Sequence, residues 1–133
     1  MLLPHGAVIA VADGAKLELF RNAGTATAPS LTALPTPELT PQNRSAGVRR
    51  DSTVINPEDQ LEEDAHAAAV AEWLNHEVLT HRIEKLVVIA PPRTLGELRR
   101  HYHKELTAAL IGELPRELIG RGPQAVVEAL RGK

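Results

Sequence analysis

The chain has 133 residues, which suits one domain that buries a sizeable core. It contains no cysteine, so disulfides, thiol nucleophiles and thiolate metal sites are excluded. Fifteen basic and seventeen acidic residues give a formal net charge of −2, which argues against non-specific nucleic-acid binding by the whole surface. Because 43% of the residues are hydrophobic but only 2% are aromatic, the core must be mainly aliphatic, as in α/β layers.

The N-terminal segment 1–6 lacks the basic and apolar regions of a secretory signal. No apolar stretch approaches the length that a bilayer crossing needs. We therefore expect a cytoplasmic protein without a membrane partner, and we interpret residues 1–133 as a single domain.

The first third of the chain predicts an antiparallel meander. Residues 7–12 are apolar, Asp13-Gly14 is a two-residue turn signal, and residues 15–20 alternate at period two, which indicates a β-hairpin. A third strand is expected near Leu31 to Leu34, where several prolines blur the boundaries.

Residues 41–55 show little periodicity and bring three arginines close together, Arg44, Arg49 and Arg50. Loops of this length without structure of their own are uncommon in compact domains and are usually functional or disordered. We expect a mobile loop here.

A long helix follows this loop. Asn56 is a candidate N-cap, Pro57 suits the first helical position, and acidic residues fill the first turns, where they favour the helix dipole. Apolar residues then recur at helical spacing, which predicts a helix to about Thr80.

The most informative stretch begins at Leu86. The apolar run Leu86 to Ala90 predicts a strand covered on both faces, and it stops at Pro91-Pro92. Thr94, with Glu97 three residues on, predicts a capping box at the start of the next helix. Arg93 lies between this strand and this helix, where a guanidinium and backbone N–H groups could hold an anion together.

The remaining elements complete a fold prediction. We expect a helical region from Leu95 to about Leu110 that is broken near Tyr102, a short strand over Leu110 to Leu114, and a final helix entered at Pro123. The resulting order, βββαβαβα, is that of a ribonuclease H-like mixed sheet with helices packed on it.

The candidate catalytic residues form an incomplete set. A metal-dependent nuclease of this topology needs converging carboxylates, and Asp13 and Glu62 are candidates, but the fourth strand ends without an acid. His101 and His103, if helical, would point in different directions, and no third ligand is evident. We therefore expect no metal, and because no Gly-rich loop follows a strand, we expect no nucleotide cofactor either.

Three blocks of the sequence resemble the bacterial host attachment protein family, over nearly the whole chain. The blocks are Val11-Ala12-Asp13-Gly14-Ala15 followed by Leu19-Phe20-Arg21, the helix with Trp73-Leu74-Asn75, and the stretch from Leu86 to Arg93 with Leu95-Gly96 and Leu98-Arg99. That family is similar to the central domain of archaeal and eukaryotic peptide-release factors. The resemblance implies the same ribonuclease H-like topology and a role in colonising a host.

The resemblance also places the catalytic Gly-Gly-Gln loop of release factors at residues 42–51, which contain no Gly-Gly-Gln. Near the C-terminus, Gly120-Arg121-Gly122-Pro123-Gln124 has proline in place of the second glycine and is typical of a helix entry. Peptidyl-tRNA hydrolysis is therefore not supported.

These observations lead to three hypotheses. The first is a non-enzymatic binding protein that contacts RNA, the ribosome or a regulatory protein through Arg44, Arg49, Arg50, Arg93 and Thr94, and that supports host attachment indirectly. The second is a metal-dependent nuclease or other hydrolase that uses Asp13 and Glu62. The third is a structural or adaptor protein that forms a homodimer through an exposed sheet edge.

Overall fold

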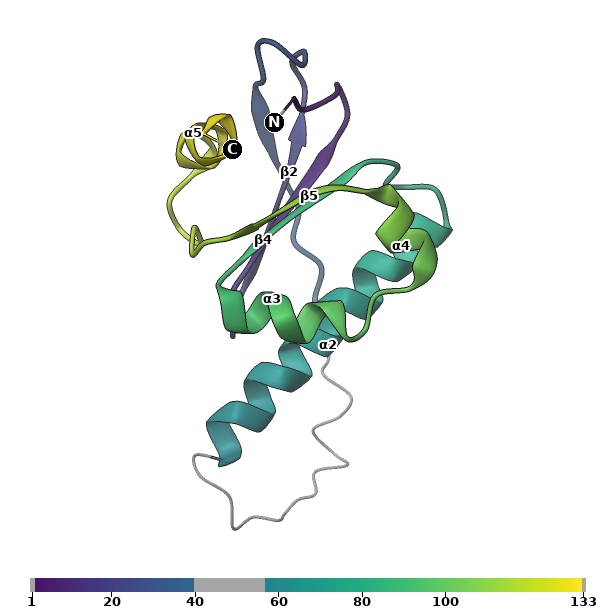
Figure 1. Ribbon diagram of the computed structural model, residues 1–133, viewed down its shortest axis with the longest axis vertical. Coiled ribbons are helices and arrows are strands. Elements are labelled where there is room, and N and C mark those ends of the chain that lie inside the picture. Colours follow the sequence, from purple (N-terminus) through teal and green to yellow (C-terminus); the bar gives the residue numbers. More distant parts are fainter. Residues whose placement is uncertain (1, 40–56, 133) are drawn as a thin grey trace.

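The computed structural model describes residues 2–39 and 57–132, and it is an α/β fold (Figure 1). The strands are β1 (Val8–Ala12), β2 (Leu17–Asn22), β3 (Leu31–Leu34), β4 (Leu86–Ala90) and β5 (Leu110–Pro115). The helices of the described part are α2 (Pro57–Leu79), α3 (Pro92–Arg99), α4 (Lys104–Ala109) and α5 (Pro123–Arg131). None of these helices combines the length and the apolar character that a membrane crossing requires.

The five strands form one mixed sheet in the order β3-β2-β1-β4-β5. β2 runs antiparallel to both β1 and β3, whereas β1, β4 and β5 are parallel. Residue Val8 pairs with Leu86 at one end of the central strands, and Val11 pairs with Ile89 near the other. β3 and β5 are the two edge strands of this sheet. Pairing of two copies through one of these edges stays a prediction.

Helices cover both faces of the sheet, as Figure 1 shows, with α5 on one side and α2, α3 and α4 on the other. β1 and β4 are buried along their whole length, so alternate side chains enter two separate cores. Val8 and Val88 belong to the core beneath α2, whereas Ile9 and Val87 belong to the core beneath α5. This double burial explains why both strands are continuous apolar runs.

Several sequence predictions are confirmed. The early meander, the third strand at Leu31–Leu34, the strand Leu86–Ala90 and the helix that starts at Pro123 all form as expected. Gly122 precedes Pro123 with a φ of 91°, a left-handed conformation that glycine adopts without strain. The long helix ends at Leu79, one residue before the predicted end.

The predicted break near Tyr102 is confirmed, because α3 ends at Arg99 and α4 starts at Lys104, so two helices lie between β4 and β5. The predicted capping box is wrong. α3 starts at Pro92, whose fixed φ and missing N–H suit the first helical turn, and no side chain caps it. Thr94 therefore lies inside the helix. Asn56 and the predicted loop at 41–55 lie outside the described residues.

Asn22, at the end of β2, holds the segment before β1 and the connection between β2 and β3. Its side chain is fully buried, and its Nδ2 donates to the carbonyl oxygens of Leu3, Pro4 and Thr25 at 2.9, 3.3 and 3.3 Å. Its Oδ1 accepts from the backbone N–H groups of Gly24 and Ser30 at 2.9 and 3.0 Å. One amide thus satisfies backbone groups of the N-terminal segment and of the β2–β3 connection.

We expect the substitution Asn22→Ala to lower the free energy of unfolding by about 2–3 kcal/mol, because it leaves buried backbone groups without partners. Urea denaturation followed by circular dichroism measures the change. Thr27→Ala, at an exposed position of the same connection, is the matched control and should change stability by less than about 0.5 kcal/mol. Equal losses in the two variants would contradict this role of Asn22.

Candidate functional site

The carboxyl ends of the parallel strands β1, β4 and β5 meet at one end of the sheet, which is where ligands bind in α/β sheets. Figure 1 shows the first turns of α2 extending past this end, where β4 passes into α3. Arg93 is the second residue of α3 and is exposed. Within residues 2–39 and 57–132, its guanidinium has no hydrogen-bond or ion-pair partner.

The other predicted contact residues are placed less favourably or are not described. Thr94 is half-buried in the first turn of α3, directly after Arg93. Arg44, Arg49 and Arg50 lie outside the described residues, in the stretch of sequence that precedes α2. Of the predicted contact residues, the structure therefore places Arg93 exposed at the carboxyl end of the sheet.

Asp13 stabilises the turn between β1 and β2. Its Oδ1 accepts from the backbone N–H groups of Ala15 and Lys16 at 2.8 and 2.7 Å. Such a side-chain bond to the backbone two and three residues on is the usual function of aspartate in a turn. This carboxylate thus has a structural role that needs no reaction to explain it.

Glu62 is exposed near the start of α2. Its neighbour Glu63 lies against the β1–β2 turn so closely that a Cβ added at Gly14 would be 2.9 Å from its side chain. His66 Nε2 lies 3.2 Å from the carbonyl oxygen of Lys16. In the part of the chain that is described, no group of three or more His, Asp and Glu residues is placed to hold a metal ion.

The histidines His101 and His103 lie in the loop between α3 and α4, so they are not on one helix. Asn75 of α2 holds this loop: its Nδ2 donates to the carbonyl oxygen of His101, and its Oδ1 accepts from the N–H of His103, both at 2.9 Å. His103 caps α4 by accepting from the N–H of Glu105 at 3.0 Å. His101 Nε2 lies 3.2 Å from a carboxylate oxygen of Glu97.

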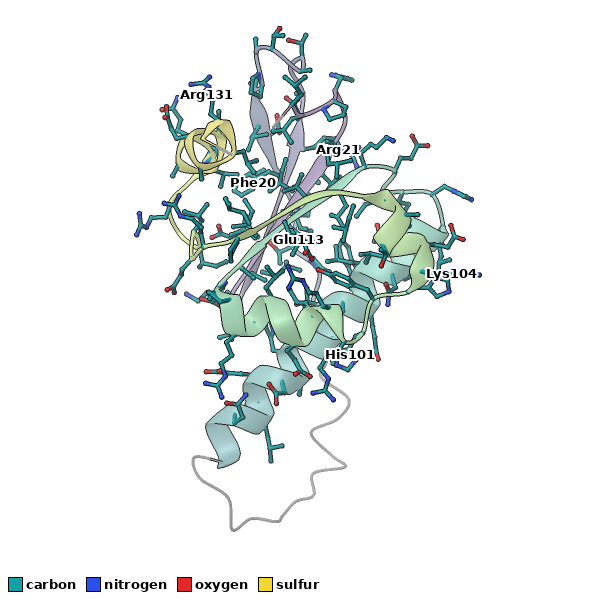
Figure 2. All side chains as sticks on the ribbon, viewed as in Figure 1. Phe20, Arg21, His101, Lys104, Glu113 and Arg131 are labelled. Carbon is teal, nitrogen blue, oxygen red and sulfur yellow. The ribbon has the colours of Figure 1, made fainter. Side chains whose placement is uncertain are left out.

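A second polar cluster joins the end of α3 to β5, and its members are labelled in part in Figure 2. The carboxylate of Glu113 accepts from Arg99 Nε and Nη2 at 2.9 and 2.7 Å, and from the Tyr102 hydroxyl at 3.1 Å. Burial raises the pKa of Tyr102, and the nearby Glu113 carboxylate raises it further. The pKa of Arg99 is also raised, chiefly by its hydrogen bonds to Glu113. All three groups are mutually satisfied, so this cluster is structural.

The sequence interpretation missed a cavity of about 340 Å³ between α2 and the sheet. It is lined by four aliphatic residues, one aromatic residue and three charged residues: Val8, Leu19, Leu34, Ile83, Trp73, Arg21, Glu77 and Arg82. The sequence contains only a weak indication of this cavity. Glu77 follows Trp73 by four residues and so shares its helix face, but a glutamate near a helix end is more often solvated.

The chain matches a model of a known protein family over almost its entire length. Residues 6–130 match the family described as bacterial archaeo-eukaryotic release factor family 12. A comparison with curated proteins gives no match. The family match spans all the described strands and the first eight residues of α5.

Tyr102 gives a prediction about stability at high pH. Its pKa is raised in the folded state, so stability is fully present below the unfolded pKa of about 10 and is lost as the pH rises above it, by about 1.4 kcal/mol per pH unit. In urea denaturation between about pH 9 and 11.5, the free energy of unfolding of Tyr102→Phe should fall less steeply with pH, by the contribution of one titrating proton. The chain has a single tyrosine, so tyrosinate absorbance reports directly on this group. Ionisation of the folded protein near pH 10 would contradict the prediction.

Proposed function

Because the chain belongs to bacterial archaeo-eukaryotic release factor family 12, we propose that it is a cytoplasmic, non-enzymatic protein that binds ribosomal RNA. The observation that carries the proposal is the family match over residues 6–130. The sheet order β3-β2-β1-β4-β5, with α2 between β3 and β4, supports the ribonuclease H-like assignment that this family suggests.

The proposed contact residues are Arg93 and Thr94 at the start of α3, together with Arg44, Arg49 and Arg50. Arg93 is exposed and has no carboxylate partner among the described residues, so its guanidinium is available to a phosphate. The protein carries a formal net charge of −2, so attraction to RNA must come from such local positive groups.

The proposal of binding without catalysis rests on the sequence of two segments. Residues 42–51 contain no Gly-Gly-Gln, the tripeptide that the resemblance to release factors would place there. The only similar sequence, Gly120 to Gln124, has Pro123 as the first residue of α5, where it serves to start the helix. Under this proposal the family scaffold is kept and the peptidyl-tRNA reaction is lost.

The resemblance to host attachment proteins extends the proposal to physiology. A protein that acts on translation inside the cell would affect attachment indirectly, through the synthesis of other proteins.

The test is co-sedimentation of the full chain with purified bacterial ribosomes over a series of salt concentrations. We expect a variant with Arg44, Arg49, Arg50 and Arg93 all changed to Ala to bind at least ten-fold more weakly. The slope of log affinity against log salt should fall by about 3, because each lost phosphate contact removes about 0.7.

The matched control changes four other basic residues to Ala: Lys85, Lys104, Arg121 and Arg131. All four are exposed, and the change in net charge is the same. The control variant should bind like the unmodified protein. Equal weakening in both variants, or binding that does not depend on salt, would overturn the assignment of these residues.

A further inference from the structure

The cavity beneath α2 lies at the opposite end of the sheet from Arg93. Val8, in its wall, is the first residue of β1, whereas Arg93 follows the last residue of the parallel strand β4. The floor is apolar, formed by Val8, Leu19, Leu34 and Ile83. Its volume of about 340 Å³ falls in the range of small-ligand sites, about 300–1,000 Å³.

Glu77 contributes a buried carboxylate to this cavity. Its side chain is 11% exposed, and the nearest cation is Arg82 Nη1 at 3.8 Å, too far for a hydrogen bond. No N–H or O–H group within residues 2–39 and 57–132 donates to this carboxylate. Buried carboxylates almost always accept hydrogen bonds, so the Glu77 carboxylate is available to N–H groups that a ligand brings into the cavity.

Trp73 adds an aromatic surface to the same wall. It is half-buried, and it lies one helical turn before Glu77 on α2, so the indole and the carboxylate face the cavity together. Stacking on such a ring is the usual way in which proteins hold an unpaired nucleobase.

Two guanidinium groups lie where the cavity opens to solvent. Arg21 projects from β2 on the α2 side of the sheet, opposite to Phe20, as Figure 2 shows. Arg21 Nη2 lies 3.5 Å from the carbonyl oxygen of Arg82, so the two arginines are neighbours. Both residues are exposed, and the side chain of Arg82 is 70% exposed. They form a positive rim that suits a phosphate group.

From these groups we infer that the cavity binds a guanine nucleotide. Guanine stacks on Trp73, its adjacent N1–H and N2–H groups donate to the two oxygens of Glu77, and its phosphate contacts Arg21 and Arg82. On the same edge, adenine, cytosine and uracil each place an acceptor beside a donor, which a carboxylate repels. A free nucleotide and an unpaired guanosine in RNA share this chemistry. The inference goes beyond the proposed function, since it does not require ribosome binding.

The first experiment titrates the full chain with GMP, AMP, CMP and UMP by calorimetry. Trp73 is the only tryptophan, so its fluorescence is a second readout of the same site. A second arm uses single-stranded U5 RNA and U5 RNA with one central guanosine. We expect guanine to bind at least ten-fold more tightly than the other bases.

The two arms separate the sources of the ligand. Preference for GMP supports a free nucleotide, and preference confined to the guanosine-containing RNA supports an RNA residue. Absence of a guanine preference in both arms overturns the inference. Ribosome co-sedimentation is unaffected by that outcome, so the two proposals fail independently.

Variants test the assigned groups. Glu77→Gln replaces one acceptor oxygen by a donor, so guanine affinity should fall at least ten-fold, whereas Glu84→Gln, the same change at an exposed position, should have no effect. Equal affinities of the Glu77→Gln variant and the unmodified protein overturn the inference. In a further titration with guanosine, the unmodified protein should prefer GMP over guanosine, and Arg21→Ala combined with Arg82→Ala should remove this preference. Arg21 and Arg82 are exposed, so we expect this double variant to fold. It therefore tests the inference even if the Glu77 variant unfolds.

Discussion

The burial of β1 and β4 on both faces is the constraint on which the rest of the structure depends. Every residue of these two strands is buried, so their backbone groups must pair within the sheet and their side chains need cover from two sides. β2 and β5 supply the neighbouring ladders. The helices α2, α3 and α4 supply one cover and α5 the other. The order of elements along the chain follows from this need, because each parallel pair requires a crossover that can carry a helix.

Apolar burial leaves the relative positions of the helices and of the N-terminal segment open, and three buried or half-buried polar side chains settle them. Asn75 joins α2 to the loop between α3 and α4 through two backbone groups. Glu113 joins β5 to the end of α3 through Arg99 and Tyr102. Asn22 does the same for the N-terminal segment and the β2–β3 connection. These residues specify geometry because each satisfies backbone or charged groups that only one arrangement brings together.

The sequence predicts those parts of the fold whose signals are local. A continuous apolar run identifies β4, and a glycine followed by a proline identifies the start of α5, since neither depends on distant residues. The Thr94 capping box fails because Pro92 competes for the same helix start, and a proline fits there without any cap. The sequence predicts Arg93 between the strand and the helix, but the same early helix start places it inside the first turn of α3. It does not reveal the cavity, because Glu77 becomes unusual only when packing against the sheet buries it.

The two ends of the sheet offer different kinds of recognition. An exposed arginine such as Arg93 gains energy from phosphate whatever the base, so it can position a nucleic acid but carries no information on sequence. A buried carboxylate such as that of Glu77 discriminates between ligands instead. A ligand that does not match its hydrogen-bonding geometry leaves a buried acceptor unpaired and binds more weakly. Affinity and selectivity are therefore separable in this fold. Under the two proposals, the exposed surface around Arg93 serves affinity, and the cavity between α2 and the sheet, with Trp73 and Glu77 in its wall, serves selectivity.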